Sequence, residues 1–277
     1  MYKLVIIGGS GAMGQLFSEL FENQGYSVDC LDKGDWEHAE TMLTDADAAI
    51  VVVPIDQTLQ VIQAVADLLP ESAVLADLTS IKAKPLEAML HAHAGPVIGL
   101  HPVFGPTISS TEKEVIVYCE GRDTKAASWL LDAFDCMGFT LHSMSAKRHD
   151  QAMDFIQGAE HFTTFCMGAF LKSEQANLND LLAVASPVYR TKLNLMGRIF
   201  DQDPELYADI IWSDPKRREL LHRYAQLIQY LLADLDTEGR DAFIKGFGSI
   251  AKWLGPFTEQ AQEESDHLLA LSKDSSL

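Results

Sequence analysis

A glycine-rich turn near the start of the chain is the first group of residues that could do chemistry. The stretch YKLVIIGGSGAMGQLF places Gly9, Gly11 and Gly14 at GxGxxG spacing, directly after an apolar run and before a helical pattern. In a dinucleotide-binding turn, the first glycine makes the tight turn, the second lets the backbone approach a pyrophosphate, and the third lets helix pack on strand. The diphosphate then lies at the positive N-terminus of that helix. This context favours a dinucleotide site over a purely structural turn.

An acidic residue at the end of the next expected strand supports the same interpretation. Asp32 closes YSVDCLD, where a carboxylate hydrogen-bonds the adenosine ribose 2′-OH and repels a 2′-phosphate. The expected cofactor is therefore NAD rather than NADP, although the adjacent Lys33 weakens this discrimination. The third strand ends in VVVPIDQT, which is either an apolar wall for the nicotinamide ring or plain strand burial. The predicted cofactor-binding residues are Gly9, Ser10, Gly11, Ala12, Met13, Gly14, Asp32, Val53, Pro54 and Ile55.

A histidine follows another expected strand, at the edge where open α/β sheets bind ligands. His101 lies in GLHPVFG, and a neutral imidazole there is suited to accept a proton from a substrate hydroxyl near neutral pH. Ser80 in DLTSIK could orient that imidazole or hydrogen-bond the same hydroxyl. Lys82 could hold a substrate carboxylate or make a structural contact. We predict His101 and Ser80 as catalytic residues and Lys82 as a substrate-binding residue.

The second half of the chain carries polar groups on helical patterns. Arg190 and Arg198 are eight residues apart, on about the same face of an otherwise apolar helix. A guanidinium binds a carboxylate bidentately, so this pair suits a dicarboxylate, with a solvated or ion-paired face as the alternative. Four other side chains share i, i+4 spacing and either line a polar pocket or form a domain-interface stripe: His149, Met153, Gln157 and His161. The run Lys216–Arg218 is most simply a solvated face, and the HAH of residues 91–93 lacks the partners of a metal site.

The elements that must position these residues change in character along the chain. Up to about residue 143, short apolar strands alternate with helical patterns, which predicts a parallel sheet covered on both faces. After Ser143 only helical periodicity is present. We therefore expect an α/β fold with two domains: a Rossmann-type doubly wound sheet over residues 1–144 and an all-helical domain over residues 145–277.

Composition excludes several classes of protein. The formal net charge of −19 argues against general binding to nucleic acid or to an anionic membrane. The four cysteines are widely spaced and no apolar stretch reaches the length of a membrane span, so we expect a reduced, cytoplasmic protein without structural zinc.

Taken together, these residues resemble the prephenate dehydrogenase family of tyrosine biosynthesis. The resemblance covers nearly the whole chain and is carried by GGSGAMG, LADLTSIK, GLHPVFG, HDQAM, SPVYRTKLNLMGRIF and YADII. It is strongest to the dehydrogenase part of the bifunctional chorismate mutase–prephenate dehydrogenases. Because the chain starts directly at the first strand, no mutase domain is expected in it.

The resemblance implies a reaction and a role for individual residues. Prephenate would be oxidised by NAD and decarboxylated to 4-hydroxyphenylpyruvate, without a metal. His101 matches the catalytic histidine and Ser80 a serine at the same site, whereas Arg198 resembles the arginine that binds the substrate carboxylate and Arg190 a supporting arginine. His161 matches a histidine near the substrate side chain and the tyrosine feedback site. The resemblance also implies that the helical domain forms a homodimer.

One residue departs from the family pattern. Glu160 stands where close relatives carry a basic residue beside the histidine, which puts feedback by tyrosine in doubt. The same acid could pair with an ammonium group, so arogenate dehydrogenase is an alternative. A 3-hydroxyacid dehydrogenase is disfavoured by the histidine of GLHP, and a non-catalytic NAD-binding regulator would not need His101, Ser80 and Arg198 together.

Overall fold

The computed structural model describes residues 2–274, which form two compact units. The first contains residues 2–157 together with Ala208–Ser213, and the second contains Gly158–Tyr207 and the chain from Asp214 onward. None of the helices in this described part combines the length and apolar character needed to cross a membrane.

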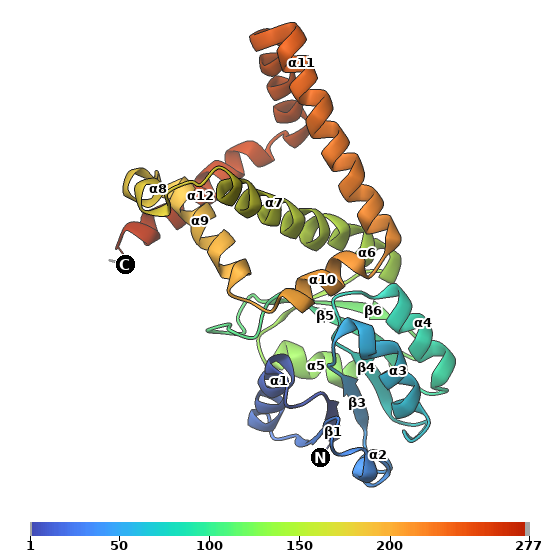
Figure 1. The fold of residues 1–277 in the computed structure, drawn as a ribbon. Coiled ribbons are helices and arrows are strands. Elements are labelled where there is room, and N and C mark those ends of the chain that lie inside the picture. The colour runs from blue at the N-terminus through green and yellow to red at the C-terminus, as the bar shows by residue number, and fades with distance from the viewer. Residues whose placement is uncertain (1, 275–277) are drawn as a thin grey trace. The chain divides into compact units, whose positions relative to one another are not determined.

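The first unit is built on one seven-stranded sheet with the strand order β2-β1-β3-β4-β5-β6-β7 (Figure 1). All neighbouring strands are parallel except β5 and β6, which are antiparallel, so the expected sheet is confirmed with β6 and β7 running opposite to the other strands. The strands are β1 Lys3–Ile7, β2 Ser27–Leu31, β3 Ala48–Val51, β4 Val74–Asp77, β5 Val97–Pro102, β6 Val115–Glu120 and β7 Thr140–Ser143. The strand order reverses at β1, between β2 and β3, which creates the ligand-binding crevice of a doubly wound sheet.

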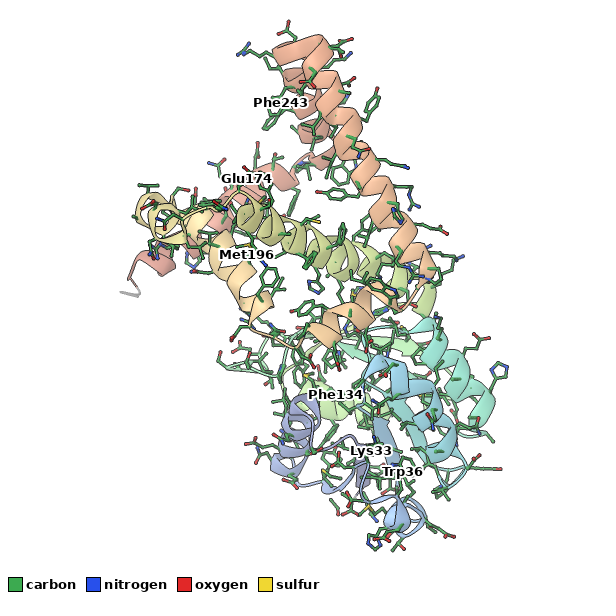
Figure 2. The ribbon with its side chains drawn as sticks, viewed as in Figure 1. Lys33, Trp36, Phe134, Glu174, Met196 and Phe243 are labelled. Atoms are coloured by element: carbon green, nitrogen blue, oxygen red, sulfur yellow. The ribbon has the colours of Figure 1, made fainter. Side chains whose placement is uncertain are left out.

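Helices cover both faces of this sheet because successive strand residues point to opposite sides. On β1, Leu4 and Ile6 pack in one core with Phe134, which is labelled in Figure 2, whereas Val5 and Ile7 pack in the other. The first core is covered by α1 and α5 and the second by α2, α3 and α4. The helices are α1 Ala12–Asn23, a 3-10 turn Trp36–His38, α2 Ala39–Leu43, α3 Ile55–Ala66, α4 Ala83–Ala92, α5 Ser128–Cys136 and α6 Ala146–Met153.

The second unit is helical, as the periodicity predicts. Its elements are α7 Glu160–Ser173, α8 Leu178–Val184, α9 Pro187–Phe200, the first turn of α10 Pro204–Trp212, α11 Pro215–Leu254 and α12 Phe257–Asp274. Helix starts follow the expected chemistry, since Ser186 and Asp214 each cap a helix whose next residue is proline. The long helix α11 is interrupted at Gly239, whose φ of 66° is non-helical, and Figure 1 shows the chain turning back along α11.

The connection between the units differs from the expected boundary at residue 144. Helix α6 belongs to the first unit, and a π-helix over Asp154–Ala159 follows it. Hydrogen bonds from α6 to β5 and to the start of α4 attach this helix to the sheet. These contacts join residues nearly 50 or more positions apart, so the helical pattern alone could not place α6 with the preceding domain.

Candidate active site

The glycine turn after β1 is packed more closely than any side chain would allow. Gly8 has a φ of +92°, and a Cβ on it would lie 2.4 Å from the carbonyl oxygen of Val52. A Cβ on Gly14 would lie 2.2 Å from the carbonyl oxygen of Gly8, so helix α1 packs directly on the turn. The predicted role of Gly14 in helix packing agrees with this geometry. The left-handed turn, however, is at Gly8 rather than at Gly9, whose missing Cβ instead gives room to Cys30 on β2.

The start of α1 and the end of β2 face this turn with complementary groups. The N-cap of α1 is Gly11, which brings no side-chain oxygen to the first-turn N–H groups, as an anion-binding helix start requires. The Asp32 carboxylate accepts hydrogen bonds from the Ser10 N–H at 3.1 Å and from Ser10 Oγ at 2.8 Å. Lys33, labelled in Figure 2, is exposed beside it. This glycine cradle and carboxylate fit the pyrophosphate and ribose of a dinucleotide.

The end of β3 supplies the predicted apolar residues. Val53 and Ile55 are half-buried, and Pro54 is exposed and forms the N-cap of α3. The valine and isoleucine therefore keep part of their apolar surface accessible, which is compatible with the predicted wall for a nicotinamide ring.

His101 is the centre of a buried chain of hydrogen bonds. It lies on β5 and is 3% exposed, and its Nδ1 is 2.7 Å from Nε2 of His149 on α6. The Nδ1 of His149 is in turn 2.8 Å from Oδ1 of Asp150. Asp150 also accepts the backbone N–H of Lys82 at 2.8 Å and that of Ala83 at 2.9 Å. The sequence pattern is compatible with either a pocket or an interface stripe for His149, and it does not single out Asp150.

The carboxylate of Asp150 is held in its ionised form. Burial acts to raise its pKa, but hydrogen bonds from His149 and from the backbone N–H groups of Ala83 and Lys82 outweigh burial, so the pKa is below its ordinary value. The two backbone donors are the N-cap and the first residue of α4, whose dipole also favours a negative charge. Asp150 is therefore a fixed anion at the end of the histidine pair.

Gln157 and Ser80 each have a buried polar atom, and Gln157 contacts this pair. Nε2 of Gln157 is 3.4 Å from Nε2 of His101, on the opposite side of the ring from His149. Gln157 Oε1 and Ser80 Oγ are both buried without a hydrogen-bond partner among the described residues. Ser80 therefore does not orient His101 through a hydrogen bond, which leaves the other predicted role, a bond to the substrate hydroxyl. Buried polar groups normally have partners, so these two atoms are suited to a bound ligand.

Lys82 is placed differently from the prediction that it binds substrate. Its side chain is fully buried, forms an ion pair with Asp77 and donates a hydrogen bond to the Leu100 carbonyl at 2.6 Å. Burial lowers the pKa of Lys82, and the adjacent Asp77 acts in the opposite direction. These contacts favour the alternative role for Lys82, a structural contact, which a lone sequence cannot show because Asp77 and Leu100 come together around the ammonium only in the fold. Lys82 instead connects the end of β4 to the residue that precedes His101.

The predicted residues of the second unit lie on α7 and α9. Arg190 and Arg198 are both exposed on α9, and Nη2 of Arg190 donates to the Leu182 carbonyl at 2.9 Å. His161 packs edge-on against Tyr207 with ring centroids 4.9 Å apart. Burial raises the pKa of Tyr207, and the charge of Arg198 opposes that effect. Tyr207 is thus a neighbour of both His161 and Arg198, and the sequence pattern did not indicate this role although Tyr207 lies in the YADII segment.

His161 is a half-buried, neutral imidazole. Burial lowers its pKa, the charge of Arg217 lowers it further, and Glu160 acts in the opposite direction. Its Nδ1 is buried without a hydrogen-bond partner in the described part of the chain. The π-helix over Asp154–Ala159 changes the i, i+4 register, so the four-residue face predicted from His149 to His161 does not continue unbroken.

Arg217 contradicts the prediction that residues 216–218 form a solvated face. Its side chain is only 1% exposed, and a Cβ on Gly158 would lie 2.8 Å from its Cδ. The missing side chain of Gly158 therefore makes room for the Arg217 stem. The sequence carried no signal for this burial, because the two residues are 59 positions apart and KRR is usually exposed.

Comparison with known proteins assigns the chain to a family. Residues 22–130 match the nucleotide-binding domain and residues 145–249 the dimerization domain of prephenate dehydrogenase. The T-protein of Enterobacter agglomerans is 46% identical over 98% of this chain and 73% of its own length. The T-protein of Haemophilus influenzae is 40% identical over 99% of this chain and 73% of its own length. The chain belongs to the prephenate dehydrogenase family.

Solved structures of this family share the fold. Prephenate dehydrogenase from Aquifex aeolicus, in complex with hydroxyphenyl propionate and NAD+, aligns with a TM-score of 0.70 at 15% identity, over 90% of this chain and 96% of that one. Arogenate dehydrogenase from Synechocystis aligns with a TM-score of 0.67 at 17% identity, over 91% of this chain and 99% of that one. The predicted fold class, a Rossmann-type domain followed by a helical domain, is thereby confirmed.

Family membership and the glycine cradle agree on the cofactor. The chain is an NAD-dependent dehydrogenase of the prephenate dehydrogenase family. A Cβ on Gly8 or Gly14 would clash with the backbone, so the turn and the start of α1 pack closely, and the Asp32 carboxylate is bonded to the Ser10 N–H of this turn. The structure differs from the prediction in which glycine makes the left-handed turn, and the individual cofactor contacts stay predictions.

Proposed function

We propose that this chain catalyses the oxidative decarboxylation of prephenate to 4-hydroxyphenylpyruvate, with His101 as the base. Membership of the prephenate dehydrogenase family supports the reaction, and the His101–His149–Asp150 chain is the observation that supports the base. His101 is 3% exposed, and one of its ring nitrogens is hydrogen-bonded to His149, which is in turn bonded to Asp150. A histidine held in this way is suited to take a proton at its other ring nitrogen.

The chemistry at the substrate ring needs three simultaneous changes. Nε2 of His101 accepts the proton of the ring hydroxyl, the hydrogen on the same carbon leaves with its electron pair, and the carboxylate on the opposite ring carbon leaves as CO2. NAD, when bound, supplies the acceptor for that hydrogen and its electrons. Asp150 stabilises the imidazolium formed on the histidine pair, and Ser80 donates a hydrogen bond to the substrate oxygen.

The carboxylates of prephenate require cationic or hydrogen-bonding partners. We assign the ring carboxylate to Arg198, with Arg190 in a supporting role, and the side chain of the substrate to His161. Exposure of both guanidiniums supports the first assignment, and the unpartnered Nδ1 of His161 supports the second. In an acidic chain, such specific cations must capture an anionic substrate.

Arogenate is the competing substrate because Glu160 precedes His161. The Glu160 carboxylate is exposed and accepts a hydrogen bond from Thr164 Oγ1 at 3.1 Å, so it is available to a substrate ammonium. The relative named "Probable arogenate/prephenate dehydrogenase" from Methanocaldococcus jannaschii is 29% identical over 94% of this chain and carries both substrates in its name. Prephenate remains the proposal because both family models that match this chain are prephenate dehydrogenase domains.

We also infer that the chain functions as a homodimer and that tyrosine acts as a feedback inhibitor at the His161 site. Exposed apolar side chains along α11, such as Tyr230, Phe247 and Trp253, support the dimer, as does the match to a dimerization domain. Light scattering after size exclusion tests the dimer, and inhibition of prephenate oxidation by tyrosine tests the feedback. Replacing Glu160 with lysine should strengthen that inhibition if the acid weakens it.

The deciding experiment is NADH formation at 340 nm with purified protein and NAD, comparing prephenate and arogenate in parallel. Faster turnover of prephenate supports the proposal. Preference for arogenate keeps the mechanism and makes Glu160 a specificity residue. If neither compound is oxidised although NAD binds, the chain is a binding protein and the proposed reaction is wrong.

A further inference from the structure

On its buried side, His101 is hydrogen-bonded to His149, which is hydrogen-bonded to Asp150. The direction of each of these hydrogen bonds can be deduced. Asp150 accepts two backbone N–H groups, those of Lys82 and Ala83, and backbone N–H groups can only donate. Its low pKa keeps Asp150 ionised, so its carboxylate has no proton to give. The third contact of this carboxylate, at 2.8 Å from His149, must therefore be a bond that His149 Nδ1 donates.

The direction of the hydrogen bond between His149 and His101 follows from the proton on His149. A neutral imidazole carries one proton, so a His149 that donates from Nδ1 can only accept at Nε2. The group 2.7 Å from that Nε2 is Nδ1 of His101, which must then be the donor. His101 in its neutral form therefore carries no proton on Nε2, the nitrogen that faces Gln157.

Three groups packed near the histidine pair leave this direction unchanged. Lys82 and Asp77 neutralise each other in a buried ion pair, and the ammonium of Lys82 is bonded to the Leu100 carbonyl. Cys119 on the adjacent strand β6 is protonated near neutral pH because burial raises the pKa of its thiol to about 11. Gln157 is uncharged. Asp150 is thus the anion toward which the histidine pair is polarised.

We propose that His149 and Asp150 are positioning residues that hold His101 in the tautomer with an unprotonated Nε2 and stabilise its charged form. The proposal rests on the proposed role of His101 as the base, and it extends that role to two residues that do not touch the substrate. The α4 N-terminus takes part as well, because its two N–H groups fix the orientation of Asp150.

Kinetics on four variants of the full chain test the energetic consequence. His149→Leu removes the acceptor, and we expect kcat to fall about 10- to 100-fold, a part of the ~10²–10⁴ that a positioned base contributes. His149→Gln restores an acceptor oxygen near the same position and should recover most of that loss. Asp150→Asn removes the anion and should move the acid limb of kcat/KM to lower pH by about one unit, the low end of the effect of a nearby charge.

The matched control is His142→Gln, which changes an exposed histidine of the same unit and should leave kcat and the pH profile unchanged. KM values for both substrates should change little in all four variants. Equal kcat for His149→Leu and His149→Gln, together with an unmoved acid limb in Asp150→Asn, overturns the proposal. Circular dichroism of each variant identifies any that fails to fold.

A measurement without turnover separates this proposal from the proposed function. In ¹⁵N-histidine-labelled protein, two-bond ¹H–¹⁵N spectra report which ring nitrogen carries the proton, and His101→Asn identifies the signal of His101. We expect His101 to carry its proton on Nδ1 in the wild type and to populate both tautomers in His149→Leu. A proton on Nε2 of wild-type His101, or an unchanged tautomer in His149→Leu, refutes the inference. If the protein oxidises neither prephenate nor arogenate, the proposed function fails, and these spectra still decide the tautomer.

Discussion

Replacing Gly14 with alanine should weaken NAD binding through a backbone clash. The added Cβ would lie 2.2 Å from the carbonyl oxygen of Gly8 and 2.8 Å from Cα of Gly9, whereas ordinary van der Waals contact begins at 3.4 Å. Because both contacting atoms belong to the backbone of the turn, no rotation of a side chain can relieve the contact. The start of α1 and the glycine turn must therefore separate by about 1 Å, a shift that native packing densities resist.

We estimate two effects of Gly14→Ala: the change in unfolding free energy, to which helix propensity and overpacking contribute with opposite signs, and the change in the Kd for NAD. Alanine in a helix is favoured over glycine by about 1 kcal/mol, whereas overpacking costs about 1–3 kcal/mol. The net loss of unfolding free energy is then about 0–2 kcal/mol, or a Tm lower by up to about 8 °C. If the shift costs one charge-assisted hydrogen bond to the pyrophosphate, worth about 1.5–3 kcal/mol, the Kd for NAD rises roughly 10- to 150-fold.

Isothermal titration with NAD and a thermal melt measure the two effects on the same sample. Gly246→Ala on α11 is the control, because its Cβ would meet nothing within 4 Å and only the helix-propensity gain applies. It should leave NAD binding unchanged and should not lower Tm. A Gly14→Ala protein that binds NAD with the wild-type Kd would refute the argument that the close contact between turn and helix forms the pyrophosphate site.

Three further predictions concern the catalytic and substrate groups. His101→Asn retains a group at the position of Nδ1 but removes Nε2, so kcat should fall about 10²–10⁴-fold with little change in KM; near-normal turnover would place the base elsewhere. Arg198→Ala should raise KM for prephenate by a factor corresponding to about 2–5 kcal/mol if the lost pair is buried in the complex, and an unchanged KM would return Arg198 to a structural role. The pKa of Asp150 is lowered in the folded protein, so Asp150 stabilises the fold above its unfolded pKa near 3.8 and loses this contribution as pH falls through the folded value. Urea unfolding of wild type and Asp150→Asn should therefore differ at pH 7 and converge in strong acid, and a difference that grows toward low pH would contradict the sign.

Much of the first unit was predictable because its signals are local. The apolar run of β1, the glycines after it and Asp32 at the end of β2 lie within 32 residues, and backbone conformation there depends on neighbours in sequence. The same holds for the helix starts at Ser186-Pro187 and Asp214-Pro215. His101 could be identified as well, because the carboxyl edge of a doubly wound sheet is where ligands bind.

The features that the sequence did not indicate share one physical cause, which is pairing between distant segments. Lys82 is a cation in an exposed-looking sequence, yet Leu100 and Asp77 close around it in the fold. Arg217 is buried because Gly158, 59 positions earlier, gives it room. The direction of a strand is also not local, and β6 runs antiparallel to β5 although its sequence reads like the parallel strands.

By itself the sequence determined the order of elements, the glycine turn, the acidic residue at the end of β2 and the histidine at the end of β5. These follow from hydrophobic periodicity and backbone sterics, which act over a few residues. Only the tertiary structure decided that His101 is bonded to His149, 48 positions away, and that the start of α4 holds Asp150. A hydrogen bond between distant side chains depends on where the packed core leaves them, and that is a property of the whole folded unit.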